Sequence, residues 1–95
     1  MPTYITLATF TDQGARNIKD SPDRFEAYKQ LAEAQGVKVL SVHWTEGPYD
    51  IVLITEGSEE ASMTSALKVA SLGNVRTQTM RAFTAKEMRN LVSKL

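Results

Sequence analysis

VKVLSVHWTEGPYDIVLITE, residues 37–56, is the stretch that decides the fold. Two segments rich in β-branched and aromatic residues, 37–45 and 50–56, lie on either side of the short connection EGPY. This composition is typical of β-strands, and so short a connection favours an antiparallel hairpin. The stretch also contains the only histidine and the only tryptophan of the chain, His43 and Trp44.

A strand and a long helix are expected before this hairpin. Residues 4–10, YITLATF, have strand composition, TDQG at 11–14 is interpreted as a turn or loop, and 15–20 as a short irregular helical turn. The helix is expected to begin at Ser21, a favourable N-cap, and to stop at Gly36, which readily adopts a left-handed conformation. Its apolar face consists of side chains at helical spacing, namely Phe25, Tyr28, Leu31 and Ala32.

A second helix, a fourth strand and a terminal helix are expected after the hairpin. Gly73 marks the end of the helix at 59–72, and residues 75–83, VRTQTMRAF, have strand composition. Thr84 and Glu87 have the spacing of a capping box, which opens the terminal helix. The predicted apolar stripes are Met63, Ala66, Leu67 and Ala70 in the first of these helices and Met88, Leu91, Val92 and Leu95 in the second.

The predicted order βαββαβ, followed by a C-terminal helix, is that of a ferredoxin-like α+β fold. We expect residues 1–95 to form a single domain, with two helices on one face of a four-stranded antiparallel sheet. A chain this short has a modest core, because it buries only about 60–65% of its unfolded surface.

Both faces of the expected sheet carry large apolar side chains, although helices cover only one face. In the second strand one face carries Leu40, Val42 and Trp44, and the other carries Val37 and Val39. In the third strand they are Ile51 and Leu53 against Val52 and Ile54. A bare apolar face usually marks an interface or a ligand groove. We therefore expect a homodimer that pairs sheet against sheet, with the terminal helix covering part of that face or reaching a neighbour.

Composition and charge exclude several classes of function. Eleven basic residues balance eleven acidic ones, and no run of charge exceeds two residues, so no basic patch for nucleic acid or an anionic membrane is expected. The absence of cysteine excludes disulfides, zinc–thiolate sites and thiol catalysis. The N-terminus lacks the pattern of a signal peptide, and no apolar run approaches the roughly 20 residues that cross a bilayer. A cytoplasmic protein is the default expectation.

Four segments resemble the GYD-domain family over nearly the whole chain, in order and with similar spacing. They are LATFTDQG at 7–14, SPDRFEA at 21–27, GPYDIV at 47–52 and SLGNVRTQTMRAFT at 71–84. The Gly–Tyr–Asp signature of that family is matched by Gly47, Tyr49 and Asp50. The resemblance implies the dimeric α/β-barrel group, whose ferredoxin-like domains pair through their sheets. Its members include cofactor-free oxygenases, haem-handling enzymes, isomerases and ligand-sensing domains, and fold alone does not choose among them.

The signature residues can be interpreted as a turn or as the rim of a pocket. In Gly47-Pro48-Tyr49-Asp50 the proline presets φ, the glycine tolerates an unusual φ, and the aspartate bonds nearby backbone N–H groups. This turn chemistry is the favoured interpretation. The alternative places Asp50 as a charge at a pocket mouth, beside Tyr49 as a donor.

His43 and Trp44 adjoin this connection on a strand, where successive side chains point to opposite faces. A single histidine is more often a structural or surface residue than a catalytic base, although its titration range suits proton transfer inside a cavity. A metal site is not expected, because the chain offers no second histidine and no cysteine.

The last strand carries two arginines on opposite faces. Thr77, Thr79 and Arg81 share one face, and Arg76 is on the other. If the first of these faces lies between two subunits, its hydroxyls and guanidinium can bind an anion or an oxygenated small molecule. The favoured alternative pairs Arg81 with an acid across the interface and Arg76 with an acid near the hairpin.

Three functions remain in competition. The first is a non-catalytic module that binds a small molecule in a pocket at the sheet or subunit interface, without a cofactor. The second is a cofactor-free oxygenase-like or isomerase-like enzyme using His43, Tyr49 and Asp50. The third is a purely structural assembly unit. The candidate ligand-binding residues are His43, Trp44, Tyr49, Asp50, Arg76 and Thr77.

Overall fold

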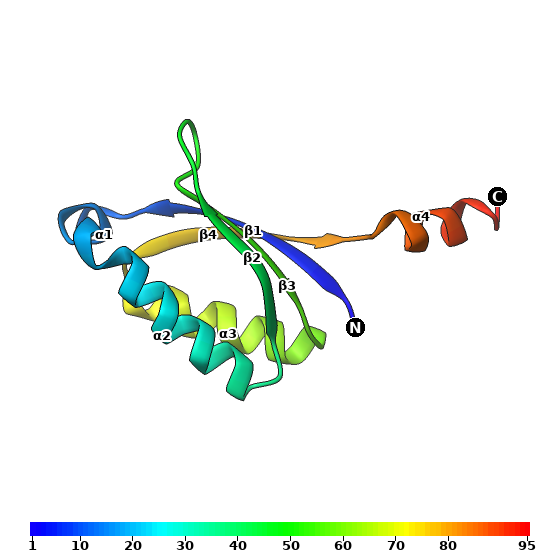
Figure 1. Cartoon of the computed structure of the whole chain (residues 1–95), viewed down its shortest axis with the longest axis horizontal. Coiled ribbons are helices and arrows are strands. Elements are labelled where there is room, and N and C mark those ends of the chain that lie inside the picture. The colour runs from blue at the N-terminus through cyan, green and yellow to red at the C-terminus, as the bar shows by residue number, and fades with distance from the viewer.

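The four strands form one antiparallel sheet in the order β2-β3-β1-β4, in a computed structural model that describes all residues from 1 to 95 (Figure 1). The sequence prediction of a ferredoxin-like α+β fold is confirmed. The hairpin of β2 and β3 pairs as its short connection predicts, and β1 lies at the centre between β3 and β4. The strands are β1 Thr3–Phe10, β2 Lys38–Trp44, β3 Ile51–Glu56 and β4 Val75–Ala82.

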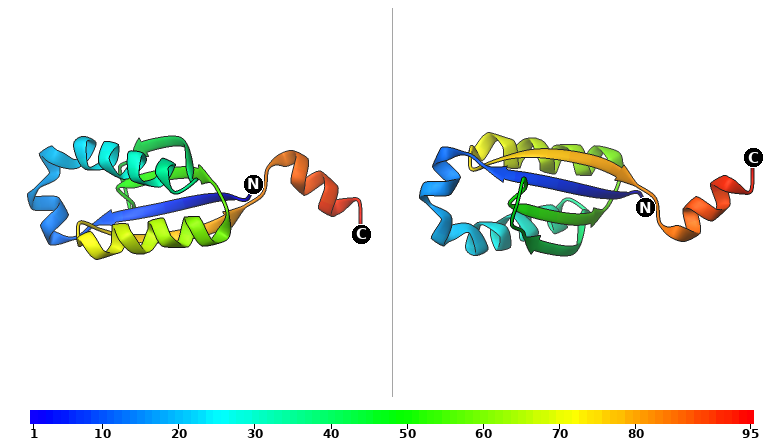
Figure 2. Two further views of the ribbon diagram at one scale, coloured as in Figure 1. Left: turned by 90° about the horizontal axis from the view of Figure 1, so that it is seen from below. Right: turned by 90° about the horizontal axis from the view of Figure 1, so that it is seen from above.

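Two long helices lie side by side on the same face of the sheet, and the other face is left open (Figure 2). These are α2, Ser21–Ala34, and α3, Glu59–Leu72. The short helix α1, Asp12–Arg16, and the 3₁₀ turn η1, Ile18–Asp20, connect β1 to α2. The terminal helix α4, Ala85–Val92, extends away from the rest of the molecule (Figure 1).

Helix ends follow the sequence in most places. Gly36 and Gly73 have positive φ beyond the ends of α2 and α3, and the capping box of Thr84 and Glu87 is complete. The prediction that Ser21 is an N-cap is wrong, because its backbone is already helical (φ −56°, ψ −44°). TDQG is also not a turn: the Thr11 side chain accepts a hydrogen bond from the N–H of Gly14 and starts α1.

A β-bulge at Leu40 overturns the predicted faces of β2. The register of β2 with β3 shifts between Val39 and Ser41. The extra residue places Val39 opposite Thr55 and Trp44 opposite Ile51, so both face the helices. Leu40 is left exposed rather than sharing a face with Trp44. In β1 and β3 the predicted alternation of faces is confirmed.

The face of α3 that packs on the sheet also differs from the apolar stripe predicted for this helix. Ser62, Ser65, Ala66 and Val69 face the sheet, whereas Met63 and Leu67 are each 58% exposed. Of these inward residues, Ser65 is buried and its hydroxyl donates to the side chain of Gln35, at the end of α2, at 3.0 Å. The predicted stripe of α2 is confirmed, with Ala32 fully buried and the side chains of Phe25 and Tyr28 turned toward the sheet.

The chain buries little of itself. Only eight residues are buried, and the apolar side chains among them are Ala8, Ala32 and Val37. The accessible surface is 6539 Å², compared with about 5,400 Å² for a folded monomer of this mass. The radius of gyration is 14.4 Å, compared with about 12 Å for a compact chain of this length. Much of the apolar surface is therefore not covered within one chain.

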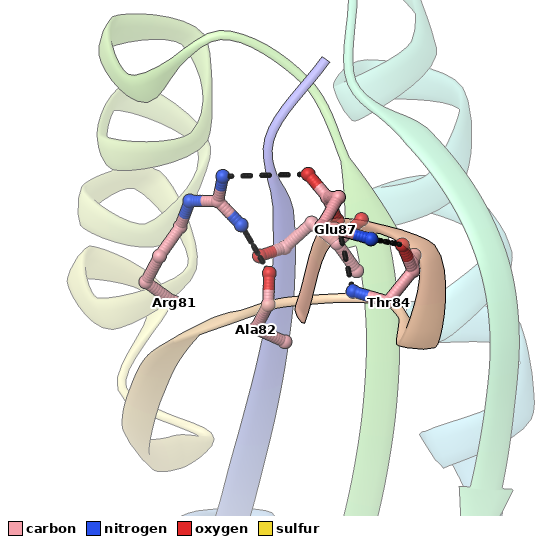
Figure 3. Close-up of polar contacts among 5 residues, drawn as sticks. Arg81, Ala82, Thr84 and Glu87 are labelled. Carbon is pink, nitrogen blue, oxygen red and sulfur yellow. Dashed lines mark hydrogen bonds and ion pairs between the residues drawn. The ribbon is translucent and has the colours of Figure 1, made fainter. Parts of the chain in front are cut away.

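Several polar contacts lie at the joint between β4 and α4 (Figure 3). Arg81 lies 3.9 Å from the carboxylate of Glu87, donates to the carbonyl of Ala82, and stacks 4.3 Å above the ring centre of Phe83. Glu87 accepts a hydrogen bond from the backbone N–H of Thr84, at 2.8 Å. The hydrogen bonds from Thr84 lower the pKa of the Glu87 carboxyl, so this cap is intact at neutral pH. Within the chain the partner of Arg81 is Glu87, and the alternative that Arg81 pairs with an acid across an interface stays a prediction.

Helix α1 docks against the C-terminal end of α3. Side chains and backbone at the start of α1 donate hydrogen bonds to the carbonyl groups at and just beyond the end of α3. Thr11 donates from its N–H to Asn74 and from its hydroxyl to Gly73, and Gln13 donates to Leu72. Such carbonyls have no partner inside their own helix. Gly14 is buried at this contact, where a β-carbon would overlap the carbonyl oxygen of Asn74.

The substitution Gly14→Ala tests this close approach. Alanine normally stabilises a helix by about 1 kcal/mol relative to glycine, but here the overlap should lower the free energy of unfolding by about 1–3 kcal/mol. Urea denaturation measures the change. Ala15→Ser, at an exposed position of the same helix, should stay within about 0.5 kcal/mol. An unchanged or raised stability of Gly14→Ala would show that α1 does not dock as described.

Candidate functional site

A cavity of about 130 Å³ lies between the sheet and the two long helices. The sheet contributes a floor with many hydroxyl groups, and one pair of them, on Thr6 and Thr79, is in contact at 3.0 Å. The five hydroxyl-bearing residues of this floor are Tyr4, Thr6, Thr55, Thr77 and Thr79. Polar side chains thus occupy a place where a sheet under helices usually carries apolar ones.

Aromatic side chains of α2 form one wall of the cavity. The rings of Phe25 and Tyr28 lie 6.1 Å apart, and the Phe25 ring meets Trp44 edge to face at 5.9 Å. The indole N–H of Trp44 donates to the hydroxyl of Ser21 at 3.0 Å. Burial raises the pKa of the Tyr28 phenol, so it is protonated at neutral pH and available as a hydrogen-bond donor.

Two polar groups beside this cavity have no hydrogen-bond partner. Nη2 of Arg24, from α2, and the hydroxyl of Ser62, from α3, are both buried and unpaired. Arg24 is the only charged residue of the lining, which contains no carboxylate, lysine or histidine. The sequence prediction missed both residues. The spacing of Arg24 with Ser21, Phe25 and Tyr28 was the available signal, because it puts a charge on the apolar face of α2.

Of the predicted site residues, Thr77 lines this cavity, and Trp44 contacts one of its lining residues. Thr77 is part of the floor, and Trp44 packs against its aromatic wall. The face shared by Thr77, Thr79 and Arg81 is the one under the helices, since Thr77 pairs with Ala8 and Thr79 with Thr6. It therefore does not lie on the open face that a sheet-to-sheet partner would meet.

The other predicted site residues lie elsewhere. His43 pairs with Val52, whose side chain is on the open face of the sheet, and is exposed. Arg76 is exposed on the same face and forms no ion pair with a nearby acid. The Tyr49 hydroxyl donates to the Gln78 side chain at 3.2 Å. These residues do not converge on the cavity.

Asp50 is engaged with the backbone. Its Oδ2 accepts the N–H of Phe10 at 2.8 Å, its own N–H donates to Ala8, and its carbonyl accepts the N–H of Thr45. Gly47 has φ of +102° in the same connection. These contacts tie the hairpin loop to the end of β1 and match the turn interpretation of the signature.

Two further properties of the chain concern metals and membranes. No group of three histidine, cysteine, aspartate or glutamate side chains is arranged to hold a metal ion. None of the helices has the length and apolar character needed to span a bilayer.

The sequence matches the GYD domain family over residues 4–92. A relative from Thermus thermophilus is 37% identical over 90 residues, which cover 93% of this chain and 95% of the relative. That protein is named glutamine synthetase and cystathionine beta-lyase binding protein.

Solved structures share the fold at lower sequence identity. FFRP-DM1 aligns with a TM-score of 0.56 and 20% identity, covering 87% of this chain and all of its own. The protein TTHA0845 from Thermus thermophilus aligns with a TM-score of 0.53 and 24% identity, covering 90% of this chain and 96% of its own. At these identities the likeness concerns the fold alone.

The substitution Asp50→Ala separates the turn role from a catalytic one. Because it leaves the N–H of Phe10 without its acceptor, we expect a loss of about 1–3 kcal/mol in the free energy of unfolding. His43→Ala, at an exposed position, should change it by less than about 0.5 kcal/mol. Thermal or urea unfolding of both variants measures this, and equal stabilities would argue against the turn role of Asp50.

Proposed function

This chain belongs to the GYD domain family, and on that premise we propose that it is a homo-oligomeric binding module that holds a small molecule without catalysis. The cavity between the sheet and helices α2 and α3 is the proposed pocket. The observation that carries the proposal is the composition of its lining, which offers hydroxyl groups and aromatic walls but no carboxylate or imidazole. Such a site can bind and orient a ligand, but it lacks the usual general acids and bases.

The enzyme alternative has less support. Its three residues, His43, Tyr49 and Asp50, lie outside the cavity, and Asp50 is occupied by backbone hydrogen bonds. Of the candidate binding residues, the proposal keeps Trp44 and Thr77 and replaces the others with residues of α2 and α3.

The homo-oligomer is supported by the open face of the sheet. Antiparallel register places a band of apolar side chains there, consisting of Ile5, Leu7, Val52, Ile54 and Met80. Pairing two such faces would remove the band from water, as the resemblance to sheet-paired proteins implies, at about 25 cal/mol for each Å² of apolar area. A specific interface of this kind buries about 1,200–2,000 Å² in total.

The terminal helix supports the same conclusion. Its apolar stripe, predicted from i, i+3, i+4 and i+7 spacing, is exposed along its length, with Met88 at 53% and Val92 at 51%. Helix α4 extends away from its own sheet, and Arg81 and Glu87 are in contact at the joint (Figures 1 and 3). We therefore propose that α4 packs on a neighbouring copy and not on its own chain.

Native mass spectrometry of freshly purified protein tests assembly and ligand together. We expect a dimer or a multiple of it, with an added mass if the natural ligand is retained. Met80→Glu should give monomers, because it buries a charge in the proposed interface. Met63→Glu, which adds the same charge to the outer face of α3, should leave the oligomer intact. A monomeric wild-type protein would contradict the proposed assembly.

Protein partners are a second candidate function, favoured by the name of the Thermus relative and by one surface. The outer face of α3 exposes Met63 and Leu67, one helical turn apart. Exposed apolar side chains of this kind are typical of protein contacts. On this proposal the face docks on glutamine synthetase or cystathionine beta-lyase.

Co-elution with each purified enzyme on size-exclusion chromatography tests this second candidate. The wild-type chain should co-elute with at least one of the two enzymes. Leu67→Glu should abolish co-elution, whereas Lys68→Glu, an exposed neighbour on α3, should reduce it only slightly. Failure of the wild-type chain to co-elute with either enzyme would reject the candidate.

A further inference from the structure

The cavity contains one positive charge that nothing in the chain balances. Nη1 of Arg24 donates to the carbonyl of Asn17 at 2.6 Å, but Nη2 has no acceptor although it is buried. The single ion pair of the chain joins Arg81 and Glu87, so Arg24 has no carboxylate partner. Arg24 as a whole is half-buried, but a donor that is buried without an acceptor is costly, and proteins usually pair such groups.

Ser62 lines the same cavity from the opposite helix, α3. The hydroxyl of Ser62 is also buried without a partner. Two lining residues from separate helices are therefore left with unsatisfied hydrogen-bonding capacity, and no lining side chain carries a negative charge. A ligand with a negatively charged acceptor would give Nη2 a partner and would neutralise the guanidinium.

The size of the cavity restricts what such a ligand can be. Its volume of about 130 Å³ is close to that of an engineered cavity of about 150 Å³ that binds benzene. Phe25, Leu53 and Val69 are among the apolar residues that line it. These walls favour a compact apolar body attached to the charged group.

We propose that the cavity binds a small organic carboxylate, with its head group on Arg24 and its apolar body against the aromatic wall. Ser62 supplies a second donor to the ligand. Because Nη2 is buried, the Arg24 side chain rotates slightly toward the cavity when the carboxylate enters. This inference rests on the proposed pocket and adds the chemical class of its ligand.

Isothermal titration calorimetry of the full chain with two probes of matched shape tests whether the ligand is a carboxylate. Benzoate and benzamide have nearly the same shape, but only benzoate is charged. Because hydrogen bonds to charged groups are the stronger ones, benzoate should bind about ten- to a hundredfold more tightly than benzamide. Inorganic phosphate, which lacks an apolar body, should bind more weakly than benzoate.

Single substitutions show which residues are responsible for the preference for the carboxylate. Arg24→Gln should remove the preference for benzoate over benzamide, and Ser62→Ala should weaken benzoate binding several-fold. Arg16→Gln, which removes the same charge from an exposed position on α1, should leave binding unchanged. If Arg24→Gln does not fold, the comparison of the two probes on the wild-type protein still decides the class.

The outcomes separate this inference from the proposed pocket. Equal affinity for benzoate and benzamide, both lost on filling the cavity with Ala66→Phe, would keep the pocket and overturn the carboxylate. Benzoate binding that Arg16→Gln weakens and Arg24→Gln does not would also overturn it. If none of the probes binds, the pocket and its ligand class fail together, and the oligomer is judged by mass spectrometry alone.

Discussion

The sheet carries large apolar side chains on both faces, and its own helices cover only one of them. Ile5, Leu7, Val52 and Ile54 lie on the open face, whereas Ile51 and Leu53 lie beneath α2 and α3 among threonine and tyrosine side chains. In a monomeric two-layer protein the uncovered face is usually polar. Two consequences follow: the hydroxyl groups beneath the helices line a cavity, and we propose that a second surface covers the open face.

The family signature concerns the fold more than any chemistry. Gly47 supplies a positive φ, and Asp50 bonds the backbone at the end of β1. The signature therefore keeps the hairpin loop close to the central strand. The proposed binding residues Arg24 and Ser62 lie on the helices and line the same cavity as the hydroxyl floor of the sheet. A resemblance carried by the signature thus identifies the fold without locating the site.

Local rules predicted the fold well and the site poorly. Short-range backbone chemistry determines three features that were predicted from sequence. They are the glycines that follow the helix ends, the capping box at Thr84 and the β-hairpin. The faces of β2 were wrong because one inserted residue, Leu40, reverses the alternation, and a bulge leaves little trace in the sequence. The stripe of α3 was wrong because the helix turns Ser65 inward, where it bonds to Gln35 at the end of α2, and helical spacing alone does not reveal such a contact. Arg24 was missed for a similar reason, since its lack of a partner is a property of the assembled cavity.

Methionine oxidation tests the account most directly, because three methionines with similar exposure in a single chain have different predicted environments. Met80, Met88 and Met63 are 47%, 53% and 58% exposed. If a second copy covers the open face and α4, peroxide treatment of the native protein followed by peptide mass spectrometry will show Met63 oxidised quickly and the other two slowly. Three similar rates would mean that the open face and α4 remain in water and that the chain does not assemble through them.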